Sequence, residues 1–197
     1  FNGTDDTPFV DAINALPASG GTIFVKSGTY VFSKAATISK PIRIVGEHTN
    51  SVVLQNNNLT GPVFFVSDNT QLDNLSISIG TGLDITLDII ASTFVSATNC
   101  VLAGRVLLTG AIAPSFRAYK VAFSSVTAAS GILVSSGGAV LTFSEFISCS
   151  FVNLVGWVVA TPCNNVHFSS CVLASVVTLL SGGVSDVITD LTFDRCS

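Results

Sequence analysis

The carboxylates of this sequence are the side chains best suited to chemistry, and Asp84 and Asp88 form the best-spaced pair. If the segment 83–88 is extended, both carboxylates project from one face of a strand, with Asp73 nearby on a preceding strand. Glycoside hydrolysis requires two carboxyl groups facing one sugar bond. Asp84 and Asp88 are therefore the candidates for cleaving a polysaccharide, although we favour a solvated face or loop for them.

The other acidic residues point to structural roles. Asp5 and Asp6 precede Pro8 where a helix is expected to start, so we interpret them as part of that helix start. Glu145 is the only formally charged residue between 121 and 185, and we interpret it as a turn or interface residue. The remaining acidic candidates recur every fourth residue without the spacing of a metal-binding loop; they are Asp186, Asp190 and Asp194.

Basic and aromatic residues could contact a partner or a sugar, but a plain surface position is the simpler interpretation of each. His167 stands between Val166 and Phe168 in an alternating segment, so it should point outward if they point inward. The others are Arg105, Arg117 and Lys120, which could flank a groove, and Trp157, which could be a sugar platform or an interface anchor. We assign no catalytic residue.

The five cysteines suggest packing rather than metal binding or disulfides. Their number is odd and no C-x-x-C occurs. Three of them close similar segments, Phe146–Cys149, Phe168–Cys171 and Phe193–Cys196, so we expect an interior ladder of reduced thiols. The sequence predicts no metal and no cofactor.

Composition excludes several classes of protein. Among 197 residues, 48% are apolar and only 10% are charged, so the chain can bury a core. The net charge of −4, without a cluster of Lys or Arg, argues against nucleic acid as a partner. No apolar run reaches the roughly 18 residues of a membrane span. Because the chain starts at Phe1 and lacks Met, we expect a processed product or a segment of a longer protein.

The elements that must position these side chains are one helix and many short strands. Phe9, Ala12, Ile13 and Leu16 have helical spacing, and the helix should end before Pro17. Beyond Gly21, segments rich in Val, Ile, Phe and Thr alternate with turn residues and predict an all-β chain. Predicted strands include 22–25, 29–32, 41–45, 51–54, 63–66, 115–117, 131–134, 156–159 and 176–180.

A polar residue followed by alternating apolar positions recurs along the chain. The repeats start at Asn74, Asn99, Lys120, Glu145, Asn165 and Asp190, which are 20 to 25 residues apart. Several short strands within such a period predict a solenoid whose coils stack at the inter-strand spacing of about 4.8 Å.

The opening of the chain resembles a known family. The segment 3–7, the short helix, and the residues from Gly20 to Tyr30 resemble the start of pectin-lyase-like right-handed parallel β-helices, especially those of phage tailspikes and tail appendages. The segment 41–47 resembles their next coil. The resemblance implies a right-handed parallel β-helix over residues 21–197, with residues 1–20 forming an N-terminal capping segment.

This resemblance is weak for function, because the same fold carries lyases, hydrolases and inert adhesins. The nearly uncharged stretch 121–185 suggests walls packed against other subunits, and related phage appendages are commonly homotrimers. We therefore expect a structural or receptor-binding domain of a phage tail or capsid appendage, homotrimeric, in contact with other virion proteins and a host surface glycan, without membrane insertion. The alternatives are a tailspike-type polysaccharide lyase or glycoside hydrolase, and a secreted or cell-surface adhesin.

Overall fold

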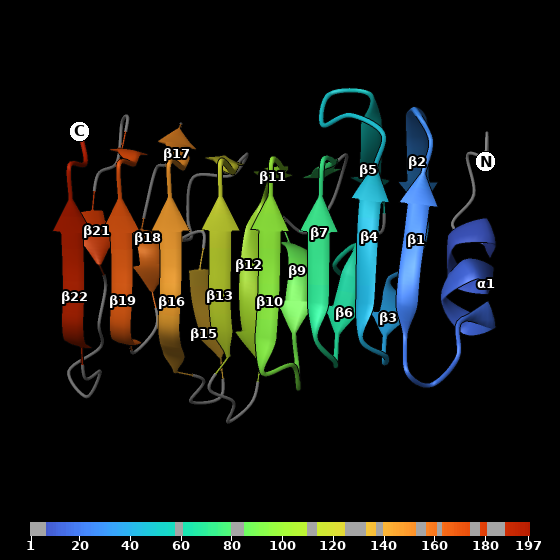
Figure 1. The fold of residues 1–197 in the computed structure, drawn as a ribbon, viewed down its shortest axis with the longest axis horizontal. Helices are drawn as coiled ribbons and strands as arrows, with labels where there is room; N and C mark the ends of the chain where they lie inside the picture. The colour runs from blue at the N-terminus through green and yellow to red at the C-terminus, as the bar shows by residue number, and fades with distance from the viewer. Residues whose placement is uncertain are drawn as a thin grey trace.

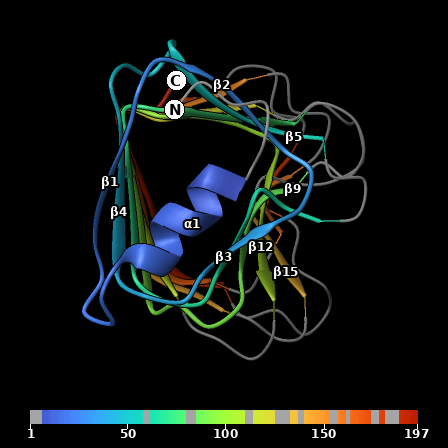
Figure 2. The same cartoon turned by 90° about the vertical axis from the view of Figure 1, so that its right-hand side faces the viewer.

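The chain winds as a parallel β-solenoid with one short helix at its N-terminal end (Figures 1 and 2). This computed structural model describes residues 7–57, 61–79, 85–109, 114–124, 133–136, 140–152, 157–160, 163–173, 178–180 and 188–197. Seen from the N-terminal end in Figure 2, the chain rises through β1, crosses through β2 and descends through β3 while it recedes, so the winding is right-handed. The predicted fold class is confirmed.

Three parallel sheets form the walls of the solenoid. Sheet A contains β1 (Gly21–Val25), β4 (Ile42–Gly46), β7 (Thr70–Asp73), β10 (Phe94–Thr98), β13 (Ser115–Tyr119), β16 (Leu141–Ile147), β19 (Cys163–Ser169) and β22 (Ile188–Asp194). Sheet B contains β2 (Gly28–Phe32), β5 (Val52–Asn56), β8 (Ser76–Ile79), β11 (Val101–Ala103), β14 (Ala122–Ser124), β17 (Ser150–Val152) and β20 (Val172–Leu173). Sheet C contains β3 (Ala36–Ile38), β6 (Phe64–Val66), β9 (Ile85–Ile89), β12 (Arg105–Thr109), β15 (Leu133–Ser136), β18 (Trp157–Ala160) and β21 (Thr178–Leu180).

The helix α1 (Thr7–Ala15) covers the first coil, as its amphipathic spacing predicts (Figure 2). Phe9 and Ile13 are buried, and the Phe9 ring lies 5.5 Å from that of Phe32 and 5.6 Å from that of Phe64. The end of the helix is held by Lys40, whose Nζ donates hydrogen bonds to the carbonyl oxygens of Ile13, Asn14 and Leu16. α1 is the one helix in the described ranges, and none there is long enough to span a membrane.

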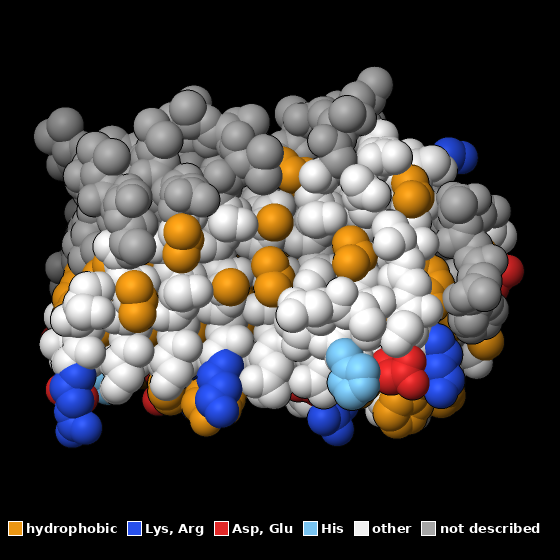
Figure 3. Space-filling view, turned by 90° about the horizontal axis from the view of Figure 1, so that it is seen from above, with side chains coloured by type: hydrophobic (Ala, Val, Ile, Leu, Met, Phe, Trp, Pro, Cys, Tyr) orange, Lys and Arg blue, Asp and Glu red, His pale blue; other side chains and the backbone are white. Residues whose placement is uncertain are grey.

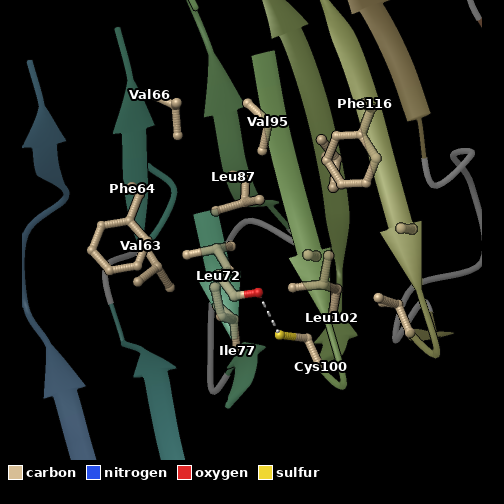
Figure 4. Packing of buried hydrophobic residues seen from close by; sticks show 14 of the residues in the cluster. Val63, Phe64, Val66, Leu72, Ile77, Leu87, Val95, Cys100, Leu102 and Phe116 are labelled. Carbon is tan, nitrogen blue, oxygen red and sulfur yellow. Dashed lines mark hydrogen bonds between the residues drawn. The ribbon is translucent and has the colours of Figure 1, made fainter. Parts of the chain in front are cut away.

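The core is a set of stacks that run along the solenoid axis, because equivalent residues of successive coils lie above one another. Leu72, Ile77, Leu87 and Leu102 show this packing around one coil, and each is fully buried (Figure 4). Toward the C-terminal end, aromatic rings replace the aliphatic residues. Phe146 stacks on Phe168 at 4.7 Å between ring centroids.

The predicted thiol ladder is present. Cys149, Cys171 and Cys196 occupy equivalent turns between sheets A and B, and Cys100 occupies the same position in an earlier coil. Each sulfur donates to a backbone carbonyl one coil back, at 3.2 to 3.6 Å, and Figure 4 shows this bond from Cys100 to Leu72. All are free thiols, and burial raises the pKa of Cys100 to about 11.

The predicted repeat is wrong in phase from Glu145 onward. Asn74, Asn99 and Lys120 lie at the turn from sheet A to sheet B with φ of 50° to 55°, but Glu145 lies within β16 and pairs with His167. The equivalent turn positions, with φ of 51° to 54°, are Ser148, Ser170 and Arg195. Asn165 and Asp190 instead share the phase of Phe143, at a bend inside the longer strands of sheet A.

Candidate binding face on sheet A

The outer face of sheet A is where the described polar, charged and aromatic side chains gather. Because residues alternate inward and outward along a strand, each strand offers two outward positions, and the registers align them in two rows. Row 1 contains Thr22, Arg43, Gln71, Ser96, Arg117, Glu145, His167 and Thr192. Row 2 contains Phe24, Val45, Asp73, Thr98, Tyr119, Ile147, Ser169 and Asp194.

A shallow basin of about 290 Å³ lies on β10, β13 and β16. Arg117 and Glu145 form its polar centre, with 3.3 Å between Arg117 Nε and Glu145 Oε2. Tyr119 and Ile147, both exposed, supply an apolar side, and Ser96 and Thr98 line the other edge. The basin therefore combines a guanidinium, a carboxylate, hydroxyl groups and an aromatic ring within one open depression.

Two cation–ring contacts hold this basin in shape. The guanidinium carbon of Arg117 lies 5.7 Å from the centroid of the Phe94 ring, and Lys120 Nζ lies 5.1 Å from that of Tyr119. Such contacts are worth about 0.5–1 kcal/mol at an exposed site, so they orient the side chains without fixing them rigidly.

A second basin of about 230 Å³ lies nearer the N-terminal end of the same face. Arg43, Gln71 and Asn69 line it, and Arg43 Nε lies 2.6 Å from Asp73 Oδ2. Arg43 and Arg117 are separated by three strand spacings in row 1, which is about 14 Å along the axis. The face thus repeats an arginine–carboxylate pair at a spacing that an extended ligand could bridge.

This arrangement is suited to binding rather than to bond cleavage. Each carboxylate among the outward positions of sheet A, namely Asp73, Glu145 and Asp194, is in an ion pair with a neighbouring arginine. An ion-paired carboxylate is a hydrogen-bond acceptor, whereas a general acid needs a carboxyl group that holds a proton near neutral pH. In the part of the chain that the structure describes, no group of three or more His, Cys, Asp or Glu could hold a metal ion.

The structure separates the carboxylates that the sequence analysis singled out. Asp88 lies on β9 in sheet C, Asp73 lies on sheet A, and Asp84 lies outside the described residues. The predicted solvated position of Asp88 is wrong, because the residue is only 7% exposed and its Oδ1 has no hydrogen-bond partner. Burial raises the pKa of the Asp88 carboxyl, and the Thr109 hydroxyl partly offsets this rise.

The other candidates are distributed over the molecule. His167 points outward in row 1 while Val166 and Phe168 are buried, so its predicted orientation is confirmed. Arg117 and Lys120 flank the basin, but Arg105 lies on β12 of sheet C and cannot share it. Asp5, Asp6, Asp186 and the side chain of Trp157 lie outside the described residues, whereas Asp190 is exposed at a bend of β22.

Sequence reasoning missed Arg43 and Tyr119 as members of this face. Neither belongs to a motif, and both are brought to the face by strand register alone. The signal that could have found them is the alternation within 42–46 and 115–119, where they occupy the outward positions. Aligning those positions across coils requires the coil lengths, which vary along this chain.

The fold and this face define the class of protein: a parallel β-solenoid with a decorated outer wall. No protein-family model and no curated protein sequence matches the chain. Among solved structures, the chain is similar to a protein of Geobacillus virus E2 described as ORF18, with a TM-score of 0.66 and 14% sequence identity. The alignment covers 99% of this chain and 46% of that protein, so the chain spans about half its length.

Proposed function

We propose that this chain is a structural, receptor-binding β-solenoid domain of a phage tail or capsid appendage. It acts as a homotrimer beside other virion proteins and attaches the particle to a glycan on the host surface. The observation that carries the proposal is the similarity of nearly the whole chain to a phage protein. At 14% identity that similarity concerns the fold, so the function is argued from the surface of this chain.

The outer face of sheet A supports attachment to a glycan. Sugars are recognised by hydrogen bonds from charged and amide side chains and by the apolar faces of aromatic rings. The basin around Arg117, Glu145 and Tyr119 offers these groups together. The second basin, around Arg43 and Gln71, repeats the polar part about 14 Å away, a distance that suits a chain of sugars rather than a single one.

The test combines location with binding. Antibodies against this chain should label intact phage particles at a tail or capsid appendage. The purified chain should bind at least one member of a panel of bacterial capsular polysaccharides, lipopolysaccharides and teichoic acids. Arg117→Ala should weaken that binding at least tenfold, whereas Lys34→Ala, which removes a cation outside sheet A, should leave it unchanged.

Two results would overturn the proposal. Absence of the chain from purified particles would remove the virion role. Release of reducing ends or unsaturated uronates from a bound polysaccharide would make the domain a depolymerase instead of a binding module. Equal binding by Arg117→Ala and the unaltered chain would exclude sheet A as the attachment face.

A further inference from the structure

The outer face of sheet B differs sharply from that of sheet A. Its two rows of outward positions contain Thr29, Val53, Ser76, Val101, Ala122, Ser150 and Val172, and then Val31, Gln55, Ser78, Ala103, Ser124 and Val152. None of these side chains is charged or aromatic, and all are at least partly accessible to solvent. Figure 3 shows this face from above, with small apolar patches spread over an uncharged surface.

The contrast between the two faces is informative, because both belong to one solenoid and have the same strand spacing. Sheet A carries Arg43, Asp73, Arg117, Glu145 and Asp194 on its outward rows. A wall of a solenoid that stays in water normally carries about 25–35% charged residues with both signs interspersed. Sheet B lacks them over its whole described extent, so we infer that it is not a wall that stays in water.

The side chains of sheet B also indicate what covers it. A glycan, a nucleic acid or a membrane would require aromatic platforms, cations or large apolar side chains, and the face offers none of these. Small and β-branched residues instead leave it flat, with a lattice that repeats at about 4.8 Å. The surface that fits such a lattice is another uncharged β-sheet with the same repeat, and a second copy of this chain carries one.

The edge of the face has the charge pattern of an interface rim. Charged residues line the turns between sheets A and B, along one edge of the view in Figure 3. They include Lys26 and Glu47, which lie 3.9 Å apart, together with Lys120 and Arg195. Interfaces between proteins commonly join an uncharged centre to a polar, solvated rim, and a rim of both signs complements itself in a second copy.

We propose that sheet B is the face through which copies of this chain pack against one another. The proposal rests on the homotrimer of the proposed function and names the surface that forms it. It also assigns separate roles to two walls, since packing through sheet B leaves the basins of sheet A open to solvent.

Light scattering after size exclusion tests the assignment. The unaltered chain should have a mass near three times 20.3 kDa. Ala122→Glu places a carboxylate at the centre of sheet B and should reduce the mass to that of one chain. Ser96→Glu, the matched change on sheet A, and the conservative Ala122→Ser should both leave the larger mass. Circular dichroism should show the same β-sheet content in all four proteins.

Footprinting of the unaltered chain with hydroxyl radicals provides a test that needs no variant. In the associated fraction, Val101 and Val172 should be protected, while Tyr119 and Ile147 on sheet A should stay reactive. A larger mass with Val101 and Val172 still reactive would overturn the face assignment but not the trimer. A mass of one chain would overturn both, and glycan binding by sheet A would still be tested separately.

Discussion

At the scale of single residues, the most unusual group is the buried carboxylate of Asp88. It lies on the outer side of sheet C between Phe65 and Leu107 on the neighbouring strands, yet it is almost inaccessible. A carboxylate without full hydrogen bonding in such a place destabilises the folded state. Protonation relieves that destabilisation, which is why burial raises its pKa.

Asp88→Asn should therefore stabilise the protein at alkaline and neutral pH. Since the folded-state pKa of Asp88 is raised, the stability provided by its proton is complete below the ordinary pKa of an aspartate and is lost as pH rises through the raised value. Urea unfolding should show a gain on the order of 1 kcal/mol at pH 8, shrinking toward zero near pH 4. Asp73→Asn is the control, and it should show no such gain because Asp73 is ion-paired with Arg43. Equal stability of Asp88→Asn and the unaltered chain at pH 8 would contradict this account.

At the scale of elements, α1 is held by one side chain from outside the helix. The last carbonyl groups of a helix have no partner within it, and a cation placed there also interacts favourably with the helix dipole. Lys40 meets both needs, with Nζ 2.6 Å from the oxygen of Leu16 and 3.0 Å from that of Asn14. The lysine lies between β3 and β4, so it ties the helix to the second coil.

Lys40→Met keeps the length of the side chain and removes these hydrogen bonds. We expect α1 to open locally, at a cost of about 1–2 kcal/mol. Hydrogen exchange should then be roughly tenfold or more faster at the amides of residues 10–15, while amides in β16 and β19 keep their rates. Lys34→Met is the matched control. Unchanged exchange in α1 would mean that packing of Phe9 and Ile13 alone holds the helix.

At the scale of the whole molecule, the sequence predicted the architecture better than the site. Alternation and turn residues were enough to predict β1, β2, β4 and β5 within a few residues, and the helix. The phase failed at Glu145 because the coil from Lys120 to Ser148 is 28 residues long and the previous one is 21. The basins of sheet A could not be predicted, since Arg43 and Arg117 become neighbours on one face only through the registers of several coils.

The solenoid also depends on its covered first coil. Phe9→Asp puts a carboxylate against the rings of Phe32 and Phe64, so α1 should detach and expose both the apolar core and unpaired strand edges. We expect a loss of about 3 kcal/mol or more in stability and assemblies larger than a trimer in light scattering. Phe24→Asp, at a ring that is 74% exposed on β1, should change neither. A monodisperse Phe9→Asp protein would show that the cap is dispensable.

The stacking of coils has a mechanical consequence. Each coil is held by its neighbours through three parallel ladders, and equivalent turns are 21 to 28 residues apart along the chain. A force pulling on the last coil would load all three ladders of that coil and nothing beyond it. The solenoid should then lengthen in discrete steps of roughly 70–100 Å, one per coil released. Such a rod would absorb a sudden tug by shedding coils from one end while the rest of its length stays folded.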